Sequence, residues 1–255
     1  MKVKLFILTA VVASSVVISG CCGLVTREIG DVLPRGMVII EDSDREVTQE
    51  LALTGFDRVD ISSAFRVDLS QSGTFSVVVY VDENLAEYVE VEVEGSTLKI
   101  RLDRRYSYQM VNVVPMEVNV TMPELVGLTA SGASEAIVAG FESTKSLDLG
   151  LSGASSLEGQ IEAGDTWVEA SGAAKVTLTG SAQDVRIDAS GGSEVDLSGF
   201  PVADADVEAS GASSVTVNAR GRLDVEASGG SRVYYLGKPA LGRIETSGAA
   251  SVEGK

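Results

Sequence analysis

The sequence predicts an all-β fold, a β-helix or solenoid with coils of about 19 residues and an N-terminal β cap or insertion. Ser-Gly pairs followed by Ala or Gly recur seven times, 18 to 21 residues apart. A repeat of this length indicates a solenoid or an array. Apolar and polar residues alternate on both sides of each pair, which is typical of strands with one buried face. Beyond the first 20 residues the sequence has no amphipathic helical pattern of useful length.

The N-terminal segment 1–20 is predicted to be a lipoprotein signal peptide. Lys2 and Lys4 precede the apolar stretch LFILTAVVASSVVI, which is short for a membrane span. The following Ile18-Ser19-Gly20-Cys21 resembles the prokaryotic lipoprotein box, in which cleavage leaves a Cys that carries lipid. We expect lipidation at Cys21, which places the protein outside the cytoplasm, anchored to a membrane of the cell envelope or cell surface. The alternative is an ordinary signal peptide with an accidental Cys.

The mature chain divides into three parts. Residues 21–50 contain LPRG and the acidic run EDSDRE without sustained periodicity, so we expect a lipidated tether that is mobile or extended. Residues 51–127 form an N-terminal β region with a first coil and a cap or insertion. Residues 128–255 form the repeat solenoid.

The N-terminal β region contains several strand patterns. VDISSAFRVDL at 59–69 has the frame of the repeat VEASGASSVTV at 207–217, with Ser63 in place of Gly, and predicts a degenerate first coil. Residues 75–81 and 116–123 predict strands, and 82–89 a turn or one helical turn. Residues 89–103 predict a hairpin about 94–96, which brings together Val89, Val91, Val93, Leu98, Ile100 and Leu102.

The repeats share columns of residues counted from the Ser of each pair. Residues three and one before it, and five and seven after it, are mostly apolar and should point inward. The invariant Gly suits a tight corner with positive φ, and the Ser hydroxyls should bond to the corner backbone. A second Gly nine residues after the Ser predicts the opposite corner. The Ser of the pairs are Ser131, Ser152, Ser171, Ser190, Ser210, Ser228 and Ser247, and the second glycines are Gly140, Gly180, Gly199 and Gly237.

Composition excludes several kinds of chemistry. The net charge of -17 disfavours nucleic acid, because the phosphate backbone would be repelled. The chain has no His and only 2 Cys, which excludes an imidazole base and a framework of several disulfides. The Gly-rich SGA and SGG segments repeat seven times, which suits architecture better than a unique site. We therefore expect no catalysis and no cofactor other than Ca²⁺ as a candidate.

Two surface clusters are candidate sites. The first is an acidic column two residues before the Ser, which either keeps the protein soluble or binds Ca²⁺ or another ligand. Trp167 should point outward near it. The second is a basic-aromatic tip that contacts a partner or is a plain connection. The column is Glu169, Asp188, Glu208, Glu226 and Glu245, and the tip is Arg104, Arg105, Tyr106 and Tyr108.

Across residues 52–250 the chain resembles a known family. The segments GFDRVDISSAFRVDLSQSG, VVVYVDENLAEYVEVEVEGSTLKIRL and LTASGASEAIV, in this order, are similar to the putative auto-transporter adhesin head domain, also called the head GIN domain. The resemblance implies a secreted or lipid-anchored protein with a β-helix-like fold and a role in adhesion, and it supplies no catalytic residues. Ser63-Ala64 departs from the Gly of the other corners and leaves the geometry of the first coil open.

Together these patterns predict a lipid-anchored extracytoplasmic solenoid that binds a partner through outward columns, either a cell-surface glycan or a protein. One alternative is a structural envelope protein without a specific ligand. The other is a carbohydrate-active enzyme that uses a pair of carboxylates. The ligand and the oligomeric state stay open.

Overall fold

The computed structural model describes residues 2–4, 36–111 and 115–255. Most of the predicted signal peptide, and Cys21 at which we expect lipidation, therefore lie outside the described residues. Within that predicted peptide, β1 (Lys2–Lys4) pairs antiparallel with β7 (Val89–Glu94). No helix in the described ranges is long and apolar enough to cross a bilayer.

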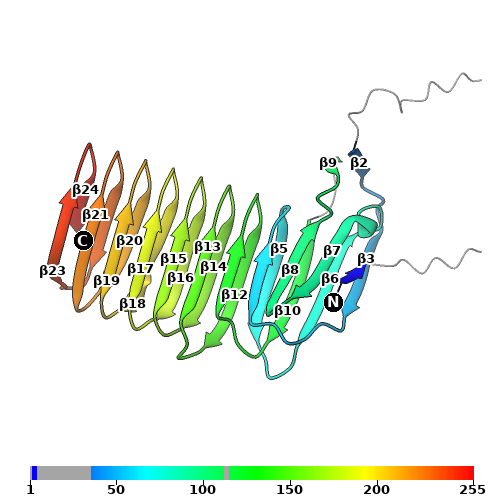
Figure 1. Ribbon diagram of the computed structural model, residues 1–255, viewed down its shortest axis with the longest axis horizontal. Coiled ribbons are helices and arrows are strands. Elements are labelled where there is room, and N and C mark those ends of the chain that lie inside the picture. The colour runs from blue at the N-terminus through cyan, green and yellow to red at the C-terminus, as the bar shows by residue number, and fades with distance from the viewer. Residues whose placement is uncertain (1, 5–35, 112–114) are drawn as a thin grey trace, which may run out of the picture.

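The described chain is a β-solenoid in which parallel coils stack along one axis (Figure 1). Each repeat coil gives one strand to each of two facing sheets. The first sheet runs from β11 through the odd-numbered strands to β23, and the second from β12 through the even-numbered strands to β24. The all-β prediction is confirmed. The repeat strands are β11 (Gly127–Ala130), β12 (Glu135–Glu142), β13 (Leu147–Leu151), β14 (Ser156–Glu162), β15 (Thr166–Ala170), β16 (Lys175–Ser181), β17 (Val185–Ala189), β18 (Glu194–Val202), β19 (Ala205–Ala209), β20 (Ser214–Ala219), β21 (Arg222–Ala227), β22 (Arg232–Leu236), β23 (Ala240–Thr246) and β24 (Ser251–Gly254).

The core lies between the two sheets and is filled by the predicted inward columns. Val207 pairs in register with Ile187 and Val225, and all three side chains are buried. On the opposite sheet Val215 pairs with Val195 and is also buried. Stacking identical columns in parallel register buries one face of every strand, which is the main stabilising contribution for a core poor in aromatics.

The corner at each Ser-Gly pair has the predicted conformation. Gly211 has φ 70°, and a Cβ at this position would lie 2.7 Å from the carbonyl oxygen of Gly191 in the neighbouring coil. The Ala212 N–H donates to that same oxygen at 2.7 Å. The backbones of successive corners therefore touch, which excludes any side chain at the Gly.

A buried hydroxyl ladder lies three residues after the Ser of the pair, a position that the sequence analysis did not single out. The buried Ser213 Oγ donates to Ala189 O at 3.2 Å, and Ser193 Oγ donates to Ala170 O at 3.2 Å. The hydroxyls of the pair itself make weaker contacts, such as Ser171 Oγ to Leu151 O at 3.5 Å. The corner bonding expected of the pair is therefore made chiefly by the next Ser along.

Three of the four second glycines, Gly140, Gly180 and Gly199, lie within strands and do not form the opposite corner, whereas Gly237 lies in the turn between β22 and β23, as predicted. Gly140 lies within β12, where the pairing with β14 shifts by one residue, and Gly199 lies within β18, where the pairing with β16 shifts by one residue. A bulge takes up an extra residue and bends the strand without reversing it. The chain reverses later, at residues 143–146 in the first repeat and 203–204 further along.

The predicted degenerate first coil is confirmed. β4 (Arg58–Ile61) pairs parallel with β11, and β5 (Phe65–Gln71) pairs parallel with β12. Ser63 and Ala64 have φ 71° and 62°, so this corner uses two left-handed residues. Where the repeats carry Ala at the second of these positions, as at Ala212, that residue does not have a positive φ.

The segment 75–123 forms both a cap and one more coil. β8 (Thr97–Leu102) and β10 (Met116–Met122) pair parallel with β4 and β5 on the side away from the repeats. β7 pairs antiparallel with β8 in the predicted hairpin register, with Val91 opposite Ile100. β6 (Ser76–Asp82) pairs antiparallel with β10, and η2 (Ala86–Tyr88) is the predicted helical turn. Antiparallel strands thus cover this end of the parallel stack.

The described part of the segment expected to be a tether contains two strands. β3 (Glu46–Leu51) pairs antiparallel with β6 at the edge of the second sheet, where Leu51 is buried. β2 (Met37–Glu41) pairs parallel with β9 (Ser107–Val111) in a small ribbon beside the cap (Figure 1). Residues 37–51 are therefore part of the folded cap. The side chains of β3 alternate between more and less exposed positions, as expected of a strand that pairs with β6.

Candidate functional site: the outer face of the first sheet

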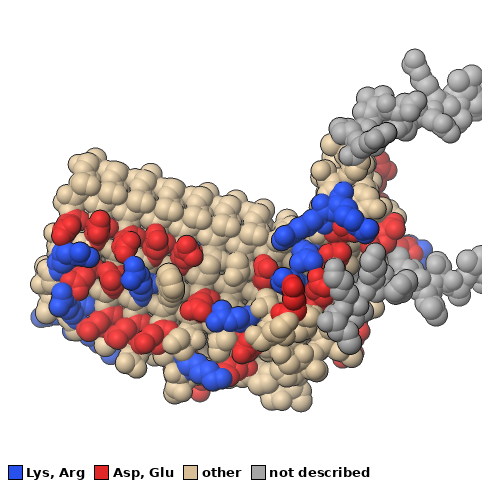
Figure 2. Space-filling view, in the orientation of Figure 1, with Lys and Arg blue, Asp and Glu red and all other residues tan. Residues whose placement is uncertain are grey.

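Charged side chains form rows on the outer face of the first sheet (Figure 2). One row, the corner-side column, is the predicted acidic column: Glu169 pairs with Asp188, Asp188 with Glu208, Glu208 with Glu226, and Glu226 with Glu245. Their stacking follows the prediction. Like charges in neighbouring strands repel each other unless they are screened or paired.

The described residues contain no group of three or more His, Cys, Asp or Glu side chains arranged to hold a metal ion. The corner-side column runs one carboxylate per strand, about 4.8 Å apart, so neighbouring acids do not converge on one point. Cation binding by this column stays a prediction that the described geometry does not favour.

A middle column lies next to the corner-side column and contains the chain's single Trp. Asp148, Trp167, Arg186 and Asp206 occupy the same register on β13 to β19. Trp167 points outward, as predicted, and is 51% exposed. The Arg186 guanidinium carbon lies 6.0 Å from the Trp167 ring centroid, and Arg186 Nη2 donates to Glu208 Oε1 at 2.8 Å.

A third row of acids follows the loops at the start of the strands. Asp184 Oδ1 accepts from the Asp204 N–H at 3.0 Å, and Asp204 Oδ1 accepts from the Arg222 N–H at 2.7 Å. Arg222 also donates to Asp224 through Nε at 2.6 Å and Nη2 at 2.9 Å. This bidentate contact, aided by the Arg243 N–H, lowers the pKa of Asp224. Carboxylates here serve to hold successive coils together.

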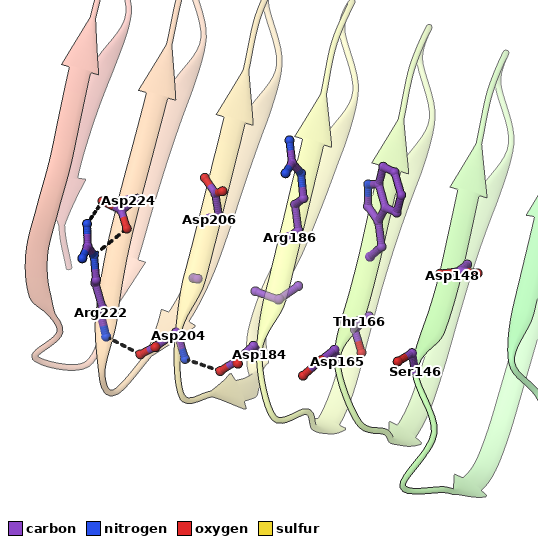
Figure 3. Close-up of a pocket in the computed structure, with 13 residues that line it drawn as sticks. Ser146, Asp148, Asp165, Thr166, Asp184, Arg186, Asp204, Asp206, Arg222 and Asp224 are labelled. Atoms are coloured by element: carbon purple, nitrogen blue, oxygen red, sulfur yellow. Dashed lines mark hydrogen bonds and ion pairs between the residues drawn. The ribbon is translucent and has the colours of Figure 1, made fainter.

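A shallow groove of about 580 Å³ runs between these rows across several coils (Figure 3). It combines an exposed indole with carboxylates and two guanidinium groups, a mixture suited to a polar ligand with an apolar face. The sequence predicted that Trp167 points outward but did not identify the other groove residues. Most of these charged residues stand four or six positions before the Ser of a repeat, and reading those two columns would have found them. The groove is lined by Ser146, Asp148, Asp165, Thr166, Trp167, Asp184, Val185, Arg186, Asp204, Ala205, Asp206, Arg222 and Asp224.

The basic-aromatic tip is largely occupied by its own contacts. Arg105 Nε donates to Asp103 Oδ2 at 2.8 Å, and Tyr108 Oη donates to Asp103 O at 2.8 Å. The rings of Tyr106 and Tyr108 pack edge-on against Tyr88, with centroids 5.5 and 5.6 Å from it. Burial raises the pKa of Tyr108, and the negative charge of Asp103 adds to the effect. The structure separates this tip from the groove, and a partner role for it, including that of Arg104, stays a prediction.

Comparisons with known proteins agree with the fold. The sequence matches the family described as putative auto-transporter adhesin, head GIN domain, over residues 55–239. A putative adhesin from Bacteroides fragilis superposes with a TM-score of 0.79 at 20% identity, covering 85% of this chain and 100% of that one. A putative lipid binding protein from Parabacteroides distasonis has a TM-score of 0.63 at 18% identity, covering 86% and 100%.

A putative adhesin from Parabacteroides merdae has a TM-score of 0.62 at 16% identity, covering 85% of this chain and 99% of that one. A comparison with curated proteins found no significant match. At these identities the structural likeness establishes a shared fold alone. The family match spans most of the chain, so the protein belongs to the putative auto-transporter adhesin, head GIN domain family.

Proposed function

We propose that the protein is a non-catalytic adhesion or partner-binding module, anchored outside the cytoplasm by lipid at Cys21. The observation that carries the proposal is the groove beside Trp167. A large exposed aromatic lies on a rigid sheet face there, within a hollow that carries a few polar groups, and such hollows are the usual sites of ligand recognition.

The solenoid supports this function by holding the groove rigidly. Each groove residue belongs to a strand, or lies next to one, that is paired on both sides, so little conformational freedom is lost on binding. Membership of an adhesin-named family agrees with an extracellular or surface role. The acidic rows keep nucleic acid and anionic membrane surfaces away.

The binding function is tested with the mature chain carrying Cys21→Ser, so that lipid does not contribute. We expect this protein to bind intact cells or immobilised envelope glycans, and Trp167→Ala to reduce binding at least tenfold. Asp68→Asn on the second sheet is the control and should bind as the parent does. Absence of binding to cells, glycans and envelope material would instead support the purely structural role.

The lipid anchor is tested separately by metabolic labelling with a clickable fatty acid. We expect label on the wild-type chain and none on Cys21→Ser. Label retained by the Cys21→Ser variant would contradict the proposed anchoring site.

A further inference from the structure

A second, smaller hollow lies on the other side of Trp167 from Arg186. It has a volume of about 270 Å³, below the usual range for drug-sized ligands and suited to a single ring. It belongs to β4, β11, β13 and β15 at the N-terminal end of the repeat. The hollow is lined by Arg58, Thr129, Asp148, Leu149, Gly150, Trp167 and Glu169.

Gly150 opens this hollow, and the fold does not require a glycine there. It lies inside β13 between Thr129 and Glu169 of the flanking strands and has no positive φ. A Cβ at Gly150 would lie 3.8 Å from Thr129 Oγ1, which is ordinary van der Waals contact. A glycine inside a strand weakens it, and it often marks a place where a ligand approaches closely.

Gly127 has a related effect on the same face. A Cβ there would lie 2.5 Å from Arg58 Nη1, so the missing side chain lets Arg58 lie across β11. Arg58 Nη2 thereby reaches Asp148 Oδ2, two strands away, at 2.8 Å. Two glycines that no corner requires thus shape one hollow and position an ion pair at its edge.

The charges around the hollow favour an uncharged ligand. Arg58 and Arg186 lie on either side of Trp167 and are each paired with a carboxylate, so both ion pairs are close to neutral and neither guanidinium is left to hold an anion. An anion would meet Glu169 and the acidic column beyond it. A polyol can accept from Arg58 and donate to the oxygens of Asp148, Glu169 and Thr129 without bringing a charge.

We propose that this hollow binds one pyranose ring of a neutral glycan, with the apolar face of the ring against Trp167 and its hydroxyls toward the polar rim. The inference rests on the proposed binding function and names its ligand class. Aromatic side chains suit such ligands because they combine a flat apolar surface with neighbouring polar groups.

Because Trp167 is the single Trp of the chain, its fluorescence reports on the groove and the hollow that it lines, and the Gly150 variant below separates the two. The mature protein is titrated with the methyl pyranosides of glucose, galactose, mannose and N-acetylglucosamine, with glucuronate and N-acetyl-lysine amide as charged probes. We expect saturable binding of at least one neutral sugar with a Kd of about 1–10 mM, and at least tenfold weaker binding of both charged probes.

Gly150→Thr fills the hollow with the residue that precedes it in the same column. We expect at least a tenfold loss of sugar affinity with an essentially unchanged melting temperature, because the Cβ fits and Thr favours strands. Asp188→Thr introduces the same side chain two coils along and should leave sugar binding intact. The pair separates filling of the hollow from a general effect of the new residue.

Three results would overturn the inference: no fluorescence change with any neutral sugar, undiminished binding by Gly150→Thr, or preferential binding of the lysine amide, which would indicate a basic protein partner. Cell attachment distinguishes this failure from that of the proposed function. If Gly150→Thr attaches to cells as the wild type does while sugars fail to bind, the binding module stands without the glycan subsite. If the wild type binds sugar yet attaches to nothing, the subsite stands without adhesion.

Discussion

At the scale of single residues, the corner glycines meet two separate requirements. Gly211 has a left-handed backbone conformation with φ 70°. A Cβ added to it would also lie only 2.7 Å from the carbonyl oxygen of Gly191. Gly55 has φ 78° but no atom within 4 Å of an added Cβ. The two positions therefore separate backbone strain from the steric effect of stacking.

We expect Gly55→Ala to lower the free energy of unfolding by about 1–2 kcal/mol through strain alone. Gly211→Ala should cost about 2–5 kcal/mol, because the new methyl also forces neighbouring coils apart. Urea unfolding of both variants measures the difference. Equal losses would mean that the stacked corners can move apart without cost.

The corner of the β4–β5 coil has a side chain where the backbone favours glycine, because Ala64 has a positive φ of 62°. Ala64→Gly should therefore stabilise the protein by about 0.5–1 kcal/mol after the extra flexibility of Gly in the unfolded chain is counted. Ala212→Gly at the equivalent position of a repeat should destabilise by about 0.4–1 kcal/mol, since Ala212 does not have a positive φ. Chemical denaturation that gives both changes the same sign would contradict this difference.

At the scale of elements, the aromatic cluster joins strand β9 to the helical turn η2. Tyr108 Oη donates to Asp103 O, and the Tyr108 ring packs against Tyr88. The raised pKa of Tyr108 means that the folded protein favours the neutral phenol. Its contribution to stability is therefore complete below pH 10, the ordinary value for Tyr, and is lost as the pH rises beyond it.

Replacing this hydroxyl tests the linkage. We expect Tyr108→Phe to lower stability at pH 7 by about 0.5–1.5 kcal/mol through the lost hydrogen bond. Above pH 10 its unfolding free energy should fall less steeply than that of the wild type, because the group that resists ionisation is gone. Denaturation curves at several pH values between 7 and 11 provide the measurement, and parallel pH profiles would refute the assignment.

The repeat elements were predictable because each inward column, such as Val168 to Ile187 to Val207, recurs at a nearly constant spacing. The order of the N-terminal coils was not, because the pairing of β8 with β4 depends on contacts that no local pattern encodes. The acidic column was predictable from its repetition, whereas the hollow beside Trp167 depends on Gly127 and Gly150, where the repetition is broken.

At the scale of the whole molecule, acidic side chains gather in rows on one broad face of the solenoid (Figure 2), in a chain with a net charge of -17. Glu169 and Asp188 are neighbours in the corner-side column, and dissolved salt screens the repulsion between such exposed charges. Stability should therefore depend on ionic strength.

We expect the melting temperature to rise by about 2–8 °C between low salt and physiological ionic strength. CaCl₂ at matched ionic strength should give the same increase as NaCl, because the described residues offer no converging metal ligands. Scanning calorimetry in the two salts makes the comparison. An additional increase specific to Ca²⁺ would favour the cation-binding interpretation of the acidic column.

The position of β8 and β10 has a consequence for how the chain assembles. The coil of β4 and β5 comes first in the sequence after β3, yet it lies between the coil of β8 and β10 on one side and that of β11 and β12 on the other. Both of its open edges are completed only by segments that emerge later during synthesis. This coil is therefore a template with two growth fronts, one closed by the antiparallel cap and the other extended one repeat at a time.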